Sequence, residues 1–200
     1  MNTTVFVVDD DVAMRDALAQ LLEAAGLQVE THASGPDFLA AYGENRPGCL
    51  LLDMAMPGMN GLEVQAALKA RGCAIPVLFL TGHGDIPMAV QAVQAGAVDF
   101  LEKPIKGAIL LERVQRALKL DQEWREMRGR TQAIQLRHAR LSTREQEVMA
   151  LAVTGLTSKQ IAQQLGISPR TVEVHRTHVM HKMGAANLAE LVNLAAFCTL

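Results

Sequence analysis

The first 119 residues alternate between short apolar runs and amphipathic stretches, and no other feature limits the possible folds as strongly. The apolar runs are Val5–Val8, Leu27–Thr31, Cys49–Leu52, Val77–Thr81 and Val98–Leu101. Three of these runs are almost continuously apolar, which is typical of strands buried on both faces of a parallel sheet. Strands that alternate with helices in this way predict an α/β fold, with helices on both faces of a doubly wound, five-stranded parallel sheet.

A different pattern follows this region. Residues 121–140 are rich in Arg, Gln and Glu, and neither Gly nor Pro interrupts residues 108–128, which predicts a linker that extends the preceding helix and is part helix, part flexible. From Leu141 the pattern is helical, with four helix-start signals at Ser142, Thr157, Ser168 and Asn187. We therefore expect a first domain over residues 1–120, a linker over 121–140, and an all-α, four-helix domain over 141–200. The tight turn Leu165–Ile167 indicates a helix-turn-helix unit.

The net charge of −2 hides an uneven distribution along the chain. Residues 1–120 hold 9 Lys and Arg against 14 Asp and Glu, a net charge of −5, which suits a cation site. Residues 121–140 carry +2 and residues 141–200 carry +1, which by itself is weak evidence for a DNA-binding protein. No apolar run approaches the roughly 20 residues of a membrane span. Three widely spaced cysteines are typical of reduced thiols, and we see no signal peptide, so we expect a cytoplasmic protein.

Charged and hydroxyl side chains follow several of the predicted strands at their carboxyl ends. Asp9, Asp10 and Asp11 follow the first strand, Asp53 ends the third, Thr81 ends the fourth, and Lys103 follows the fifth. In a parallel sheet these ends meet at one edge, which is where ligands bind. Clustered carboxylates repel one another unless a cation lies between them, and a site with only oxygen ligands favours Mg²⁺.

This set of groups predicts a phosphorylation site. Asp53 is the candidate nucleophile, and it would form an acyl phosphate while Mg²⁺ offsets the charge between its carboxylate and the incoming phosphoryl group. The Lys103 ammonium can pair with one phosphoryl oxygen, and the Thr81 hydroxyl can donate to another. Each of these residues alone is common at a strand end, so the interpretation depends on their joint occurrence.

Four segments resemble the receiver domains of two-component response regulators, most nearly those of the FixJ branch of the NarL/LuxR-type family. They are VVDDD at 7–11, LLDMAMPGMNG at 51–61, LTGHGDIPMAV at 80–90 and AGAVDFLEKP at 95–104. The resemblance implies a flavodoxin-like fold, a partner histidine kinase that phosphorylates Asp53, and metal ligation by Asp9, Asp10, Asp53 and the Ala55 backbone carbonyl.

The same resemblance assigns roles around the phosphoacceptor. Phe100 falls at the rotating switch aromatic, which acts together with Thr81 and Lys103. The Lys103–Pro104 peptide bond is expected to be cis. Ala55 and His83, each two residues beyond a pocket residue, are candidate positions for tuning the lifetime of the phosphoryl group. His83 could hydrogen-bond the phosphoryl group or simply lie on a loop.

The helix predicted to start at Pro169 has two different faces. Val172, Val179 and Met183 share the inward face. The outward face, suited to reading bases in the major groove, carries Arg170, Val174, Thr177, His178 and His181, with Glu173 beside it. Arg176 lies beside the inward stripe, so we favour it less as a base contact. The side chains expected at DNA phosphates, which set register rather than sequence choice, are Thr157, Lys159, Arg170, Thr171, His175 and Lys182.

Residues 141–196 as a whole resemble the LuxR-type DNA-binding domain. These residues and the receiver-like segments together predict a transcription regulator that binds double-stranded DNA and is controlled by phosphorylation. We expect an activator rather than a repressor. Because the module has little positive charge, two copies on adjacent half-sites are expected. The resemblance implies a homodimer that pairs through the last helix and through residues 88–95 and 98–101, with RNA polymerase as a further partner.

Two other functions remain open from the residues. A phosphatase or phosphotransferase of the haloacid-dehalogenase kind also uses an Asp nucleophile at a strand end, but such enzymes have a second Asp where this chain has Ala55. We therefore expect no enzyme activity beyond the receiver's own phosphotransfer and dephosphorylation. A constitutive DNA-binding protein with an inert receiver is the other alternative, and the intact set of pocket residues disfavours it.

Overall fold

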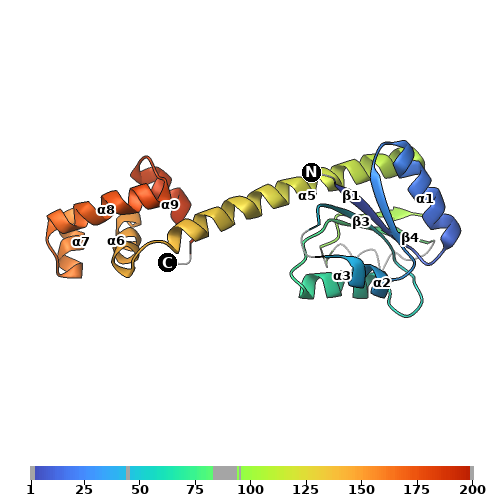
Figure 1. Cartoon of the computed structure of the whole chain (residues 1–200), viewed down its shortest axis with the longest axis horizontal. Coiled ribbons are helices and arrows are strands. Elements are labelled where there is room, and N and C mark those ends of the chain that lie inside the picture. The colour runs from blue at the N-terminus through green and yellow to red at the C-terminus, as the bar shows by residue number, and fades with distance from the viewer. Residues whose placement is uncertain (1–2, 44–45, 83–93, 95, 199–200) are drawn as a thin grey trace. The chain divides into compact units, whose positions relative to one another are not determined.

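The computed structural model describes residues 3–43, 46–82, 94 and 96–198, and it contains two compact units, Met1–Trp124 and Arg125–Leu200 (Figure 1). The contact boundary between the units falls inside one long helix, so the division at residues 120 and 140 stays a prediction. Among the helices of the described segments, none combines the length and the apolar character needed to cross a membrane.

The first unit contains a five-stranded parallel sheet in the order β2-β1-β3-β4-β5, which confirms the predicted α/β fold. The strands are β1 (Thr4–Val8), β2 (Gln28–His32), β3 (Gly48–Asp53), β4 (Val77–Thr81) and β5 (Asp99–Glu102). The helices described around this sheet are α1 (Val12–Ala24), α2 (Gly35–Ala41), α3 (Gly61–Ala70) and the first part of α5 (Gly107–His138).

Two hydrophobic clusters cover the two faces of this sheet, because successive residues of a strand point to opposite faces. Phe6 of β1 belongs to the cluster that contains Phe38 of α2 and Val64 of α3. Its neighbour Val7 belongs to the cluster that contains Leu22 of α1 and Val114 of α5. Figure 1 shows α2 and α3 on one side of the strands and α1 with α5 on the other. This double cover accounts for the nearly continuous apolar runs of β1, β3 and β4.

The second unit contains α6 (Thr143–Val153), α7 (Ser158–Leu165), α8 (Pro169–Met183) and α9 (Leu188–Ala195). Each helix begins directly after a predicted start signal, and the side chain of that residue accepts a backbone N–H of the first turn, at Ser142, Thr157, Ser168 and Asn187. The prediction of an all-helical domain with four capped helices is therefore confirmed. Gly166, which ends α7 with a φ of +65°, occupies the turn between α7 and α8.

The helix α5 differs from the sequence-based expectation of a partly flexible connector. It runs without a break from Gly107 to His138 and passes through Gly129. Asp121, expected on a solvated segment, is fully buried, and its Oδ2 accepts the backbone N–H of Gly48 at 2.9 Å. Near the other end, Ile134 is 3% exposed in the core of the second unit. Tertiary contacts at both ends stabilise this helix, and its sequence of strong helix formers does not interrupt it.

Candidate functional site

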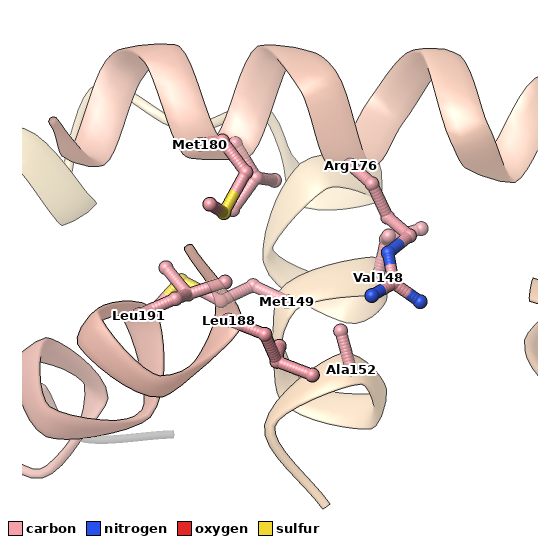
Figure 2. Close-up of a pocket in the computed structure, with 8 residues that line it drawn as sticks. Val148, Met149, Ala152, Arg176, Met180, Leu188 and Leu191 are labelled. Carbon is pink, nitrogen blue, oxygen red and sulfur yellow. The ribbon is translucent and has the colours of Figure 1, made fainter. Parts of the chain in front are cut away.

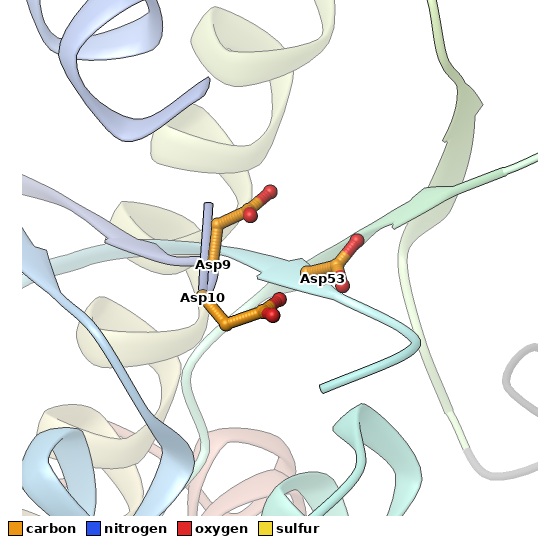
Figure 3. A group of neighbouring side chains, drawn as sticks. All are labelled: Asp9, Asp10 and Asp53. Atoms are coloured by element: carbon orange, nitrogen blue, oxygen red, sulfur yellow. The ribbon is translucent and has the colours of Figure 1, made fainter. Parts of the chain in front are cut away.

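Three carboxylates converge at the carboxyl edge of the sheet. Asp9 and Asp10 follow β1, and Asp53 ends β3. These strands pair in parallel with Val8 opposite Leu52, so that the residues after them lie side by side. One oxygen of each carboxylate lies within 4.8 Å of the others, and Figure 3 shows the three side chains around a common space. Asp9 and Asp53 are buried, whereas Asp10 is exposed.

Lys103 joins the two buried carboxylates. Its Nζ donates to Asp9 Oδ2 at 2.7 Å and to Asp53 Oδ1 at 2.6 Å. The Lys103 backbone N–H donates to the Thr81 carbonyl at 2.8 Å, which fixes the start of the loop after β5. The Lys103–Pro104 peptide bond is cis, as the sequence resemblance implied.

The surroundings of Asp53 and Lys103 shift the pKa values of both side chains. Burial raises the pKa of Asp53, and the neighbouring charge of Asp9 acts in the same direction, while the hydrogen bond from Lys103 opposes the shift. Burial works to lower the pKa of Lys103, but its hydrogen bonds to Asp53 and Asp9 prevail and raise it. Lys103 therefore stays charged, yet it offsets only part of the negative charge of three carboxylates. Such a site favours a divalent cation with oxygen ligands.

The structure also describes three other predicted pocket residues, Thr81, Ala55 and Phe100. Thr81 is buried at the end of β4, one residue beyond Leu80, the strand partner of Asp53. The backbone N–H of Ala55 donates to Asp53 Oδ2 at 3.2 Å, so Ala55 is next to the carboxylate. Phe100 lies on β5 and is 46% exposed. His83 and residues 88–93 and 95 of the predicted dimer face lie outside the described residues.

Two residues that the sequence analysis did not single out support the pocket. A Cβ atom at Gly61 would lie 2.6 Å from the Asp53 carbonyl oxygen, so only glycine lets α3 start this close to β3. The adjacent Asn60 forms a capping box with Glu63, and Gly61 itself closes the loop of residues 54–60. Arg15 of α1 donates to the Asp9 carbonyl at 2.7 Å. The Asn60–Gly61 pair is a sequence signal for a turn and could have drawn attention to Gly61. No sequence signal indicated the role of Arg15.

The predicted two faces of α8 are present in the second unit. Val172, Val179 and Met183 are buried, whereas Val174 is 48% exposed. The other exposed residues among the DNA-contact candidates are Thr157, Lys159, Arg170, Thr171, Glu173, Thr177, His178 and Lys182. His175 is only half-exposed, and its Nδ1 is buried without a hydrogen-bond partner in the described parts of the chain. Most of these candidates are therefore exposed, and His175 is only partly so.

Arg176 lies on the inner side of α8, as its position in the sequence indicated. Figure 2 shows its guanidinium beside Val148 and above Ala152, at a small apolar cavity of about 110 Å³. This cavity lies between α6, α8 and α9, and Leu188 and Leu191 of α9 complete its lining. Arg176 thus faces the interior of the second unit rather than the surface expected to meet DNA.

Glu145 connects α6 to the far end of α8. Its side chain is buried, and it accepts Lys182 Nζ at 2.6 Å on Oε2, while Oε1 lies 3.6 Å from His178 Nδ1. The hydrogen bonds from Lys182 and from the Ser142 backbone lower the pKa of Glu145 to about 2. The start signal at Ser142 is local in the sequence, whereas the partner of Glu145 lies on α8, so the sequence alone did not indicate this contact. Lys182 is consequently tied to α6 by this ion pair, although its side chain stays 37% exposed.

Two families of known proteins match this chain, one in each of its two units. The family of response regulator receiver domains matches residues 5–115, and the luxR family of bacterial regulatory proteins matches residues 139–195. The transcriptional regulatory protein FixJ of Azorhizobium caulinodans is 47% identical over 96% of this chain and 90% of its own length. The response regulator protein TodT of Pseudomonas putida is 42% identical over 96% of this chain and 85% of its own length.

Solved structures show the same similarity. The response regulator StyR matches with a TM-score of 0.86 and 44% identity, over 98% of this chain and 99% of that chain. Full-length FixJ from B. japonicum matches with a TM-score of 0.59 and 41% identity, over 98% of this chain and 97% of that chain.

Proposed function

Because this chain belongs to the response regulators that join a receiver domain to a LuxR-type DNA-binding domain, we propose that its cognate histidine kinase phosphorylates Asp53. The chain is a two-component transcription regulator and not an enzyme that turns over external substrates. The observation that carries the assignment of Asp53 is its buried carboxylate, which contacts the Lys103 ammonium within a group of three aspartates. The haloacid-dehalogenase alternative is set aside because two family models account for both units.

The donor set fits Mg²⁺, since three carboxylates lie within 4.8 Å of one another and Lys103 offsets only part of their charge. Asp9, Asp10, Asp53 and the Ala55 carbonyl would hold the ion. Bound there, Mg²⁺ would neutralise charge between the carboxylate and the phosphoryl group.

Three residues of the chain act directly around the phosphorus atom. A carboxylate oxygen of Asp53 attacks the phosphorus of the kinase phosphohistidine, the new O–P bond forms, and the P–N bond to the imidazole breaks. Lys103, already 2.6 Å from Asp53, pairs with an oxygen of the transferred group. The Thr81 hydroxyl donates to another oxygen, and Phe100 follows Thr81 inward, which biases the receiver toward its active state.

The assignment of Asp53 is tested with a small phosphodonor. We expect acetyl phosphate with Mg²⁺ to add one phosphoryl group to the wild-type chain and none to Asp53→Asn, as measured by intact-protein mass spectrometry. Asp16→Asn, which changes an exposed carboxyl on α1, is the matched control and should be labelled normally. Labelling of Asp53→Asn at the wild-type level would overturn the assignment.

We propose further that the outward face of α8 reads base pairs in the major groove. Glu173, Val174, Thr177 and His178 would contact base edges, with Arg170 at the start of the helix. The proposed phosphate contacts are Thr157, Lys159, Arg170, Thr171, His175 and Lys182. Val174→Ala should reduce discrimination between cognate and random duplexes, whereas Lys159→Gln should weaken binding to both about equally. Footprinting and fluorescence anisotropy distinguish the two effects.

Phosphorylation is proposed to act through dimerisation, and the dimer to activate transcription by contacting RNA polymerase. The small positive charge of residues 141–200, net +1, supports the need for two DNA-binding units on one operator. Sedimentation of the phosphorylated chain should show a dimer that Asp53→Asn does not form. Equal DNA binding by both forms, without a dimer, would favour constitutive binding. Three free cysteine thiols support the proposed cytoplasmic location.

A further inference from the structure

A groove lies at the amino ends of β4 and β5, at the opposite edge of the sheet from the aspartates. It consists of two adjoining cavities of about 490 and 180 Å³ that share Gly96 and Trp124 in their lining. The wider cavity is bounded by α5 and the segment before β5, and the narrower one by α3 and the start of β4. We call it the Trp124 groove. Its size falls in the range of pockets that hold small molecules, roughly 300–1,000 Å³.

An unsatisfied acceptor lies at the narrow end of the Trp124 groove. Gln65 of α3 lines this cavity and is only 7% exposed. Its Oε1 is buried and has no hydrogen-bond partner in the part of the chain that the structure describes. Buried side-chain oxygens nearly always accept a hydrogen bond, since an unpaired one loses its interaction with water without replacement. Gln65 therefore brings an unpaired acceptor next to the groove, and a turn of its side chain toward the cavity would let Oε1 accept an N–H group from a ligand.

The opposite end of the groove carries a net positive charge. Arg116, Lys119 and Glu123 of α5 line the wider cavity, and Lys69 of α3 adds a cation to the narrower one. Lys119 Nζ lies 3.9 Å from Glu123, whereas Arg116 forms no ion pair with any residue of the described ranges. Trp124, the single tryptophan of the chain, lines both cavities and therefore lies between the acceptor and the cations.

We propose that the Trp124 groove binds a planar aromatic anion that carries an N–H donor. The donor pairs with Gln65 Oε1, the ring packs against Trp124, and the anionic group lies near Arg116 and Lys119. Aromatic packing and one charge-assisted contact are the usual determinants of such sites. A nucleotide and an aromatic amino carboxylate share this chemistry, so the test uses one probe of each kind. Neither phosphorylation of Asp53 nor DNA binding is needed for this site.

The test uses the full-length chain, because its single tryptophan makes the intrinsic emission report on this groove alone. We expect AMP or anthranilate to quench Trp124 emission with saturation, after correction with N-acetyltryptophanamide for absorption by the probe. Adenosine and aniline, which lack the anionic group, should bind at least about tenfold more weakly, as expected for loss of a charged contact.

Three variants assign the contacts. Gln65→Leu removes the acceptor at nearly constant volume, and Arg116→Gln removes the unpaired cation; each should raise the Kd of the quenching probe about tenfold. Lys106→Gln, which changes an exposed lysine before α5 that does not line the groove, should leave the Kd unchanged. Circular dichroism and labelling at Asp53 confirm that each variant is folded, so the result is independent of the phosphorylation proposal.

The response to the two probes identifies the class of ligand. Saturable quenching by AMP alone identifies a nucleotide as the ligand class, and quenching by anthranilate alone identifies an aromatic carboxylate. The proposal is overturned if neither probe quenches with saturation, or if Gln65→Leu and Arg116→Gln both bind the probe as tightly as the wild type.

Discussion

At the scale of the residue, the acidic pocket depends on Lys103. In the Lys103→Met variant, Asp9 and Asp53 lose the ammonium that lies 2.7 and 2.6 Å from them. We expect the unfolding free energy of the first unit to fall by about 2–4 kcal/mol without Mg²⁺, because two buried carboxylates then repel each other. Saturating Mg²⁺ should stabilise the variant more than the wild type, since the ion replaces the missing charge.

Thermal unfolding with and without Mg²⁺ measures both effects. Lys106→Met, which changes an exposed lysine, is the control and should unfold like the wild type. An equal Mg²⁺-induced rise of Tm in Lys103→Met and the wild type would show that the ion and Lys103 do not share these carboxylates.

A second residue-scale prediction concerns pH and Glu145. Its pKa is lowered from 4.5 to about 2 in the folded unit, mainly by the hydrogen bond from Lys182. The folded state therefore binds fewer protons than the unfolded state between these values, and the stabilisation is complete above about pH 4.5 and is lost as the pH falls toward 2. At neutral pH, Glu145→Gln should destabilise the second unit by about 2 kcal/mol.

Hydrogen exchange of α6 and α8, with wild type and variant compared at matched pH, measures this difference. It should shrink as the pH is lowered from about 6 to about 3. Glu147→Gln is the control, because Glu147 is exposed and, within the described part of the second unit, forms an ion pair only with Arg144, so its effect should stay below about 0.5 kcal/mol. A constant difference across this pH range would contradict the assigned pKa.

At the scale of the element, the ends of α5 and α8 meet within the second unit. Gly184 ends α8 with a φ of +71°, and Arg137 of α5 donates to the adjacent Met183 carbonyl at 3.0 Å. A cation at this position also offsets the negative end of the helix dipole. The last turns of α5 are therefore part of the domain that carries the recognition helix, although they precede its first predicted capping residue.

Two glycine substitutions test this view of the helices. Gly184→Ala should destabilise the second unit by about 1 kcal/mol or more, because a side chain disfavours positive φ. Gly129→Ala should instead stabilise the chain by about 0.5–1 kcal/mol, since this glycine lies inside α5 and its Cβ would meet no atom within 4 Å. Denaturant unfolding of both variants gives the comparison, and a loss of stability in Gly129→Ala would mean that α5 is not a continuous helix in solution.

At the scale of the whole molecule, charge is divided between the parts of the chain. Residues 1–120 carry a net charge of −5, whereas residues 141–200 carry +1. One copy can therefore neutralise few DNA phosphates. If phosphorylation produces a dimer, the slope of log K against log salt should be about twice that of Asp53→Asn, because the number of released counterions doubles. Both slopes are measured by fluorescence anisotropy at several salt concentrations, with a duplex selected from random sequence. Identical slopes would exclude a change in the number of bound copies.

Local sequence signals were sufficient for most of the described elements and for grouping the aspartates of the acidic pocket. Ser142 and Asn187 cap helices through bonds that span three residues, so their effect is visible in a short window of sequence. The pocket was predictable because a parallel sheet places the carboxyl ends of all its strands at one edge, whatever the details of packing. Asp9 and Asp53 could therefore be grouped without knowledge of any side-chain contact.

The tertiary structure alone decided which distant groups pair. Lys103 contacts Asp9 across 94 positions of the chain, Asp121 contacts Gly48 across 73, and Lys182 contacts Glu145 across 37. Periodicity and capping report only on neighbours within a few turns, so they assigned Asp121 to the linker and gave no partner for Glu145. The buried Oε1 of Gln65, which finds no partner among the described residues, could not be foreseen either, because burial of a side chain depends on every element that packs around it.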